Sequence, residues 1–229
     1  MTGFELFIFD CDGVLVDSEP LSAVAHRTVY ARRGVVVDEA LMRSCIGMKQ
    51  KDIIAKIKSV TGFELPDSGI LEIWKEAERA IRSGLHPTPV FAEFIRMFDT
   101  PRCVASSSAP ERIHLSLETA GLMPFFNDDL IFSSTMVKHG KPAPDLFLFA
   151  ASKCNAAPEI CVVIEDSAAG VQGAVAAGMH VIGYTGGSHS DPDHAERLRQ
   201  AGADIACGSW ADIAKYLSQN QKPAVKGPA

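Results

Sequence analysis

Two aspartates, Asp10 and Asp12, stand two residues apart directly after a short apolar run near the start of the chain. The run Leu6–Phe9 has the length and composition of a buried strand, and Gly13 follows as a turn residue. In an open α/β sheet the reactive groups lie just beyond the carboxyl ends of the strands. We therefore expect two neighbouring carboxylates in a site crevice, although an Asp-rich turn after an edge strand has the same local pattern.

A cluster of serines follows a second apolar run. Residues 103–106 have the pattern of a strand, and Ser107 and Ser108 follow them just before a helix expected from Pro110. A hydroxyl and backbone N–H groups near a helix N-terminus would make an oxyanion site. Serine clusters are more commonly helix N-caps, and Ser108 is a candidate for that role.

Charged residues occur at two further turns of this kind. Lys141 precedes a segment with two prolines that opens a helix at Asp145, where a lone lysine would ordinarily be a solvated surface residue. Glu165 and Asp166 end the most β-prone run of the chain. Asp166 or Ser167 is also expected to cap the helix that follows, and a cap and a functional site can share one turn.

The acidic residues of these turns imply a cation. The two aspartates after the first strand would repel Glu165 and Asp166 if the fold brought them together. At about 4 Å and an effective dielectric constant near 20, each close pair costs on the order of 4 kcal/mol. The single charge of Lys141 cannot balance four carboxylates. A hard divalent cation can, and all-oxygen ligands with room for water suit Mg²⁺ best.

The segment at residues 9–19 resembles the first signature of the haloacid dehalogenase superfamily, most of whose members are phosphatases. The resemblance implies that Asp10 is a nucleophile that becomes phosphorylated and that Asp12 is the general acid and base. Ser106 matches the residue of the second motif that binds the phosphoryl group, and Ser107 beside it is expected to bind substrate as well.

The third and fourth motifs of this superfamily are matched by K-P-A-P-D and E-D-S-A-A-G. The resemblance implies that Lys141 holds the nucleophile and the transferring phosphoryl oxygens. It also implies a magnesium site with Asp10 and Asp166 as side-chain ligands and the backbone carbonyl of Asp12 as a third. Glu165 belongs to the same site, either in direct contact with the ion or one layer behind it.

Four consecutive helical patterns with no strand among them separate the first apolar run from the second. They cover residues 20–33, 38–45, 49–60 and 67–85. After them strands and helices alternate, which predicts βαβ units and a parallel sheet. We expect an α/β fold, a Rossmann-like parallel sheet core (residues 1–16 and 87–229) with an inserted α-helical cap subdomain (residues 17–86). The prolines at 87 and 89 would form its hinge.

The expected cap would close over the site, exclude water and recognise the leaving group. Ser22 and Lys49 are the residues we expect to bind substrate from the cap. Other candidates near the mouth, which are equally consistent with ordinary helix surface, are His26, Met48, Gln50 and Arg79. The layout is similar to that of bacterial phosphatases of sugar phosphates and phosphosugar acids, including the 6-phosphogluconate phosphatase type.

Three alternatives share parts of this pattern. A phosphomutase of the β-phosphoglucomutase type has all four motifs, but such sequences carry a histidine at the position of Ser22 and an arginine at that of Gln50. Lys49 could substitute for that arginine, and His26 lies one helical turn beyond Ser22. A haloacid dehalogenase in the narrow sense needs neither Asp12 nor a metal. A non-catalytic binding module has no need of both aspartates.

The composition of the chain argues against some classes of binding partner. The chain has 229 residues, 47% of them hydrophobic, with a net charge of −6, which argues against nucleic acid or an anionic membrane as the main partner. No apolar run approaches the ~20 residues of a membrane span. Six scattered cysteines without a C-x-x-C pair indicate reduced thiols, Cys11 among them as a structural residue. We expect a soluble cytoplasmic enzyme, a monomer or weak homodimer, with a mobile tail after residue 218.

Overall fold

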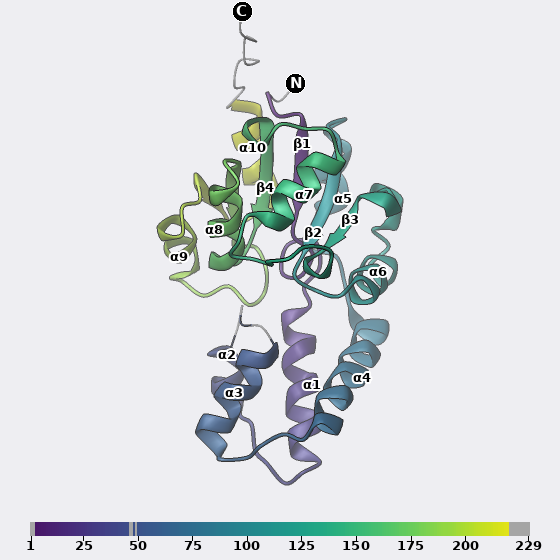
Figure 1. Ribbon diagram of the computed structural model, residues 1–229, viewed down its shortest axis with the longest axis vertical. Helices are drawn as coiled ribbons and strands as arrows, with labels where there is room; N and C mark the ends of the chain where they lie inside the picture. The colour runs from purple at the N-terminus through teal and green to yellow at the C-terminus, as the bar shows by residue number, and fades with distance from the viewer. Residues whose placement is uncertain (1–2, 46–47, 49, 220–229) are drawn as a thin grey trace, which may run out of the picture.

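A computed structural model describes residues 3–45, 48 and 50–219 of the chain (Figure 1). Within this part, parallel strands form one sheet in the order β3-β2-β1-β4-β5-β6. The strands are β1 (Leu6–Phe9), β2 (Arg102–Ser106), β3 (Ile131–Ser133), β4 (Cys161–Glu165), β5 (His180–Tyr184) and β6 (Ile205–Cys207). The chain runs outward from β1 in both directions, so the crevice at which ligands bind in such sheets lies at the carboxyl end of β1.

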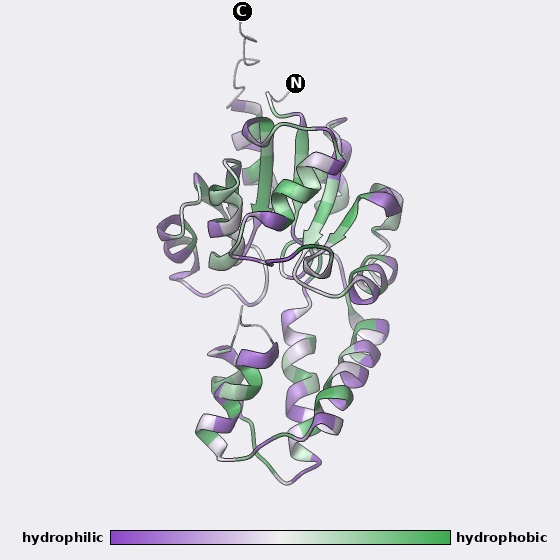
Figure 2. Cartoon of the chain, viewed as in Figure 1, coloured by the Kyte–Doolittle hydropathy of each residue, from purple (hydrophilic) through white to green (hydrophobic). Residues whose placement is uncertain are grey.

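Alternation along the strands divides the core between the two faces of the sheet. Phe7 and Phe9 of β1 pack into one hydrophobic cluster, and Leu6 and Ile8 pack into another on the opposite face. The first cluster is covered by α5 (Phe91–Arg96), α6 (Pro110–Thr119) and α10 (Trp210–Gln219). The second is covered by α7 (Asp145–Lys153), α8 (Ala168–Ala176) and α9 (His194–Gln200). The strands are accordingly mostly apolar (Figure 2), with polar residues at their ends.

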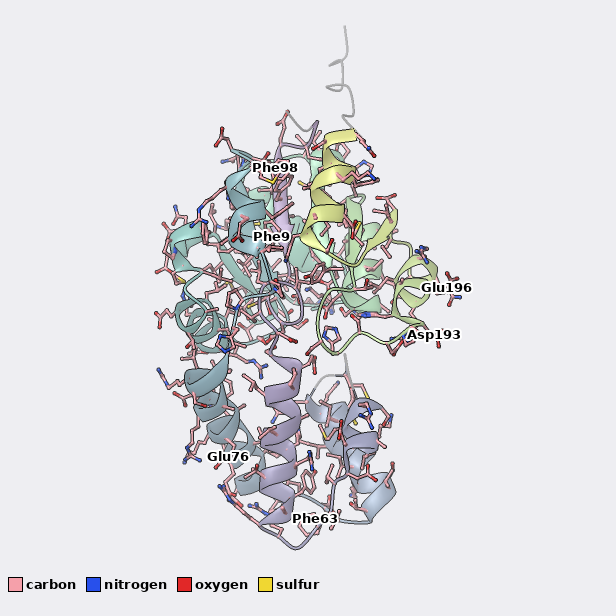
Figure 3. All side chains as sticks on the ribbon, turned by 180° about the vertical axis from the view of Figure 1, so that it is seen from behind. Phe9, Phe63, Glu76, Phe98, Asp193 and Glu196 are labelled. Atoms are coloured by element: carbon pink, nitrogen blue, oxygen red, sulfur yellow. The ribbon has the colours of Figure 1, made fainter. Side chains whose placement is uncertain are left out.

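The segment between β1 and β2 forms a separate helical lobe that projects from the carboxyl edge of the sheet (Figure 1). It contains α1 (Glu19–Ala31), α2 (Glu39–Arg43), α3 (Gln50–Thr61) and α4 (Asp67–Gly84). The lobe has a hydrophobic core of its own, and Phe63 lies at its far end while Phe9 lies inside the sheet domain (Figure 3). The expected α/β fold with a helical insertion is thus confirmed, and the exact limits of the two parts stay a prediction.

The two chain segments that enter and leave the lobe are tied to each other and to the core. Asp17 donates its backbone N–H to His86, and the residues beside them, Val16 and Pro87, form an isolated antiparallel bridge. The hydroxyl of Thr88 donates to the carbonyl of Val14 at 2.7 Å and accepts from the indole of Trp210 at 2.9 Å. The prolines expected as a hinge therefore lie beside a hydrogen-bonded junction.

Where the ends of helices and strands differ from the expected ones, the difference is one or two residues, and at two of these ends a side chain bonds to the backbone. Asp38 caps α2 by accepting from the backbone N–H of Leu41, so the helix begins one residue later. The alternating pattern predicts a last strand over residues 204–206, but β6 starts one residue later, at Ile205, and the side chain of Asp204 accepts from the N–H of Val181. Four short 3₁₀ helices were not expected. The predicted tail lies outside the described residues, and none of the helices within them is long and apolar enough to cross a membrane.

Candidate active site

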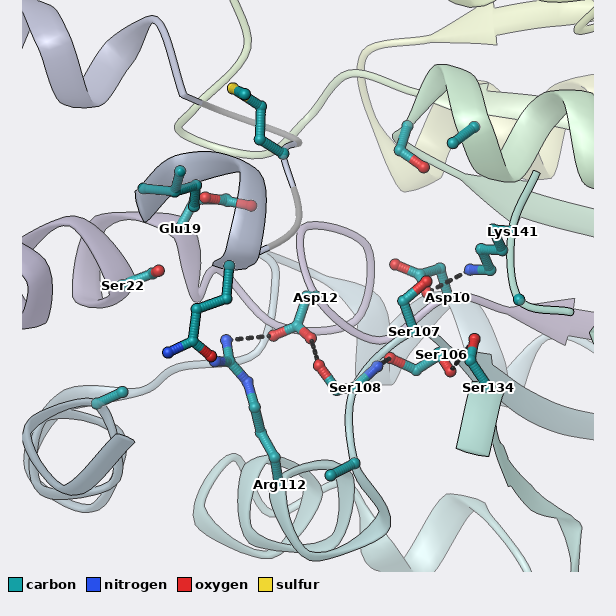
Figure 4. Close-up of a pocket in the computed structure, with 18 of the residues that line it drawn as sticks. Asp10, Asp12, Glu19, Ser22, Ser106, Ser107, Ser108, Arg112, Ser134 and Lys141 are labelled. Carbon is teal, nitrogen blue, oxygen red and sulfur yellow. Dashed lines mark hydrogen bonds and ion pairs between the residues drawn. The ribbon is translucent and has the colours of Figure 1, made fainter. Parts of the chain in front are cut away.

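The carboxyl ends of three neighbouring strands bring the predicted residues together. Asp10 follows β1, Ser106 ends β2 and Glu165 ends β4, and Lys141 reaches them from the loop before α7 (Figure 4). All four line one cavity of about 620 Å³ that the sheet domain shares with the helical lobe. The sequence motifs, although separated along the chain, therefore meet at one edge of the sheet.

Lys141 lies between two buried carboxylates. Its Nζ is 2.7 Å from Oδ1 of Asp10 and 2.6 Å from Oε2 of Glu165. Burial alone would lower the pKa of this lysine, but the two carboxylates outweigh burial and raise the pKa above its usual range. The ammonium is therefore charged at neutral pH and holds the Asp10 carboxylate in a fixed position.

Three carboxylates of the site form a cluster that suits a metal ion. Oxygens of Asp10, Glu165 and Asp166 lie within 4.8 Å of one another. Burial, and after it the charge of Glu165, raises the pKa of Asp10 and of Asp166 well above the usual range. The cluster therefore has less positive charge around it than its carboxylates need. Oε1 of Glu165 also accepts from the N–H and hydroxyl of Ser167, so its two oxygens are already engaged. The donor set of hard oxygens fits a hard divalent cation.

Asp12 lies apart from Lys141 and is held by other side chains of the cavity (Figure 4). Its Oδ1 accepts from the hydroxyl of Ser18 at 2.5 Å and from Arg112 at 3.1 Å, and its Oδ2 accepts from Ser108 at 2.6 Å. Burial raises the pKa of this carboxyl, but Arg112 and the two hydroxyls outweigh burial and hold the pKa below its usual range. Cys11 between the aspartates is buried in the core, and burial raises the pKa of its thiol, in agreement with a structural role.

The three serines at the end of β2 make different contacts. The hydroxyl of Ser106 is buried and accepts from the N–H of Ser108 at 3.1 Å, and Ser107 lines the cavity. The candidate cap, Ser108, does not cap α6, because Ala109 occupies the N-cap position. Its hydroxyl instead orients Asp12. The cap expected after β4 is present, since Ser167 accepts from the N–H of Gly170.

Two histidines that the sequence analysis did not identify contact Asp166. Nε2 of His189 lies 2.9 Å from Oδ2 of Asp166, and Nε2 of His194 donates to its backbone carbonyl at 2.6 Å. Both histidines follow β5, and a Gly-Gly pair before them was the only signal of a tight loop. Gly13 has a φ of 78°, and a Cβ there would lie 1.9 Å from Oδ2 of Asp166. The turn after β1 therefore packs directly against this carboxylate.

The helical lobe forms the other wall of the cavity. Of its predicted residues, Ser22, His26, Met48 and Gln50 line the cavity. Arg79, a candidate that was equally consistent with helix surface, does not line the cavity, because its guanidinium pairs with Glu76 on an exposed face of α4. Lys49 lies outside the described residues. The remainder of this wall includes the apolar side chains of Ile53, Ile73, Trp74 and Ala77.

Comparison with protein families identifies the chain's relatives. The model of the haloacid dehalogenase-like hydrolases matches residues 4–178. The chain is similar to the 6-phosphogluconate phosphatase of Escherichia coli, with 29% identity over 84% of this chain and 87% of that protein. It is also similar to a phosphorylated carbohydrates phosphatase of Thermotoga maritima, with 33% identity over 87% and 92%.

Solved structures show the same architecture. A haloacid dehalogenase-like protein of unknown function from Agrobacterium tumefaciens superimposes with a TM-score of 0.85 and 34% identity, over 94% of this chain and 98% of that one. A Thermotoga maritima protein provisionally assigned as a beta-phosphoglucomutase gives a TM-score of 0.78 and 28% identity, over 94% and 99%. The likeness therefore includes the helical lobe as well as the sheet domain.

Proposed function

Because the chain belongs to the haloacid dehalogenase-like hydrolase family, we propose that it is a Mg²⁺-dependent phosphatase of a small phosphorylated metabolite. The proposed substrate is a sugar phosphate or a phosphosugar acid, and the reaction passes through an aspartyl phosphate on Asp10. The observation that carries the proposal is the buried group of Asp10, Lys141 and Glu165, with Asp12 in the same cavity. The names of the relatives, phosphatases of phosphorylated sugars and sugar acids, support it.

In the first half of the reaction Asp10 attacks phosphorus in line with the leaving oxygen. Lys141 lies against Oδ1 of Asp10, which leaves Oδ2 to attack. The lysine charge also offsets the repulsion between the nucleophile and the anionic phosphate. The hydroxyl of Ser106, with Ser107 and the nearby backbone N–H groups, holds the equatorial oxygens.

Asp12 transfers the protons in both halves. Its carboxyl donates a proton to the leaving alkoxide and then takes one from the water that hydrolyses the aspartyl phosphate. Without substrate its pKa is low because of Arg112 and two hydroxyls. A phosphate bound beside it adds negative charge, which raises the pKa of a neighbouring carboxyl and favours the protonated form that the first half needs.

The metal site fits the same scheme. Asp10 and Asp166 would hold Mg²⁺ through their side chains, with the backbone carbonyl of Asp12 as a third ligand. Bound there, Mg²⁺ would neutralise charge on the phosphoryl oxygens. Glu165 acts from behind these ligands, because its oxygens accept from Lys141 and Ser167.

The helical lobe provides the leaving-group side of the site. Ser22 lies in that wall, and Lys49, next to the cavity residues Met48 and Gln50, is proposed to bind the substrate there too. Closure of the lobe on the sheet domain would exclude water from the first half of the reaction.

The test is release of inorganic phosphate from p-nitrophenyl phosphate, with Mg²⁺ and with EDTA, beside release of chloride from 2-chloropropionate. We expect Mg²⁺-dependent phosphate release and no chloride release. A panel of phosphorylated sugars and sugar acids then ranks substrates by kcat/KM. Chloride release, or phosphate release that EDTA does not affect, would contradict the proposal.

A phosphomutase is the second candidate, and the structural likeness to the provisionally assigned beta-phosphoglucomutase favours it. Against it, Ser22 lies in the cavity wall where such enzymes carry a histidine, and Gln50 lies where they carry an arginine. A second phosphate would lose that bidentate partner. The test is β-glucose 1-phosphate with Mg²⁺ and a trace of the 1,6-bisphosphate: formation of glucose 6-phosphate faster than phosphate release would favour the mutase.

A further inference from the structure

One buried histidine of the helical lobe, His26, lines the cavity, and only one of its two ring nitrogens has a hydrogen-bond partner in the part of the chain that the structure describes. Nδ1 of His26 lies 2.9 Å from the backbone carbonyl of Ser22, one turn earlier in α1. A carbonyl only accepts hydrogen bonds, so Nδ1 carries the hydrogen. Burial lowers the pKa of His26, which keeps the ring neutral. The other nitrogen, Nε2, therefore presents a lone pair and acts as an acceptor.

No partner for Nε2 of His26 exists among the described residues, although the atom is buried. Arg112 lines the same cavity from α6. One of its terminal nitrogens binds Asp12 (Figure 4), and its Nε–H is also buried without a partner. An unpaired buried polar atom is costly and rare in folded proteins. Within the described part of the chain, one acceptor and one donor remain unpaired here, on side chains of the helical lobe and the sheet domain that both line the cavity.

The surroundings limit which ligand can satisfy these two atoms. The lobe wall that contains His26 also contains Ile53, Ile73 and Ala77, which offer no hydrogen bond, and Glu19, Gln50 and Lys51, which can bond to the hydroxyls of a substrate. The lone pair of Nε2 repels a carboxylate or a second phosphate but accepts from a hydroxyl. The Nε–H of Arg112 requires an oxygen acceptor, which a neighbouring hydroxyl also supplies. A leaving group with several hydroxyls satisfies both atoms.

We propose that His26 and Arg112 form the leaving-group subsite and select a polyhydroxylated monophosphate ester. In the bound substrate one hydroxyl donates to Nε2 of His26, and an oxygen accepts from Nε–H of Arg112. This inference rests on the proposed phosphatase function. It assigns selectivity to His26, which takes no part in the transfer of the phosphoryl group.

The test compares two esters with the same six-carbon chain, sorbitol 6-phosphate and n-hexyl phosphate. The measured quantity is the ratio of their kcat/KM values. We expect the wild-type enzyme to prefer sorbitol 6-phosphate by at least about tenfold, since a site built for hydroxyls rejects an analogue that lacks them. His26→Phe keeps a flat ring but removes the acceptor, and should lower the ratio by about tenfold.

Two further variants separate hydrogen bonding from packing. His26→Gln retains an acceptor oxygen and should keep more of the preference than His26→Phe. His114→Phe makes the same exchange outside the cavity, where His114 faces Asp128, and should leave the ratio unchanged. Circular dichroism and thermal unfolding establish that each variant is folded. If His26→Phe does not fold, His26→Leu takes its place in the comparison with His26→Gln.

The outcomes distinguish the subsite from the phosphatase itself. A ratio that stays at the wild-type value in His26→Phe, or falls equally in His26→Gln, would overturn the subsite. Phosphate release from p-nitrophenyl phosphate but none from sorbitol 6-phosphate would also overturn it, and would leave the phosphatase proposal standing. Failure to release phosphate from any of the three esters would overturn the phosphatase proposal, and the subsite with it.

Discussion

The two walls of the cavity are built in different ways. On the wall formed by the sheet domain, Asp10, Lys141 and Glu165 are buried, and each is paired with side chains from remote parts of the chain. On the wall formed by the helical lobe, the polar contact of His26 is local, to a carbonyl of its own helix. The ion pairs of α4, such as Arg79 with Glu76, lie on the outside of the lobe. The cavity wall itself combines apolar side chains such as Ile53 with polar ones such as Gln50 and Lys51.

This difference separates the chemistry from substrate selection. The sheet wall is preorganised, because its charges are positioned before substrate arrives and need no rearrangement during the reaction. The lobe wall leaves a buried acceptor unpaired, which a substrate can satisfy. Substitutions on the sheet wall should therefore affect every substrate, whereas substitutions on the lobe wall should change the order of preference.

Asp10→Asn and Asp10→Ala test the sheet wall most severely. If Asp10 is the nucleophile, as we propose, its loss should lower kcat for p-nitrophenyl phosphate by at least about 10⁴-fold, because the covalent step is then lost. The fold should persist, since the buried carboxylate is repelled by Glu165. Stopped assays of phosphate release measure the effect, with Asp129→Asn on the surface as the control. Substantial Mg²⁺-dependent activity in Asp10→Ala would refute the assignment of the nucleophile.

Lys141→Met removes the one ammonium between two buried carboxylates. Loss of one partner from a buried ion pair leaves uncompensated charge, so the free energy of unfolding should fall by about 3 kcal/mol. Urea unfolding at neutral pH measures this change, with Lys215→Met on α10 as the control. Equal stability of Lys141→Met and the wild type would show that the lysine does not hold this wall together.

Asp166→Asn tests a proposed ligand of the metal site, and His189→Phe tests the histidine that contacts this ligand. Asp166→Asn should raise the Mg²⁺ concentration for half-maximal rate by about 100-fold, and His189→Phe by about tenfold, because partners behind a ligand tune its affinity. Nε2 of His189 lies 2.9 Å from Oδ2 of Asp166. Titration of activity with Mg²⁺ gives both values, and His180→Phe is the matched control. Unchanged titrations would reduce Asp166 to a structural residue of its turn.

The contrast between the walls also explains what the sequence could predict. Strand ends are readable from apolar runs, and carboxyl ends of parallel strands meet at one edge, so Asp10 and Glu165 were expected together. The direction of a side chain across loops is not encoded locally. Arg112 reaches Asp12 from α6, and His189 reaches Asp166 from a loop after β5, through packing that no spacing reveals.

On the lobe wall, periodicity predicts the helices but not their orientation toward the sheet domain. The four helical patterns were found, yet Arg79 faces outward while His26 lines the cavity. Which face of a helix lies against its neighbours follows from the apolar stripe only when one core is present. Here α1 and α4 serve both the core of the lobe and the cavity, so the stripe is ambiguous.

Thr88→Val tests the junction between the two walls and should have the smallest effect. The hydroxyl of Thr88 is buried between the carbonyl of Val14, in the turn after β1, and the indole of Trp210. Valine keeps the shape but leaves both groups unpaired, which should cost about 1 to 2 kcal/mol of unfolding free energy. Thermal unfolding measures this, with Thr28→Val on α1 as the control. Equal losses in both variants would show that valine itself, and no hydrogen bond at the junction, accounts for the change.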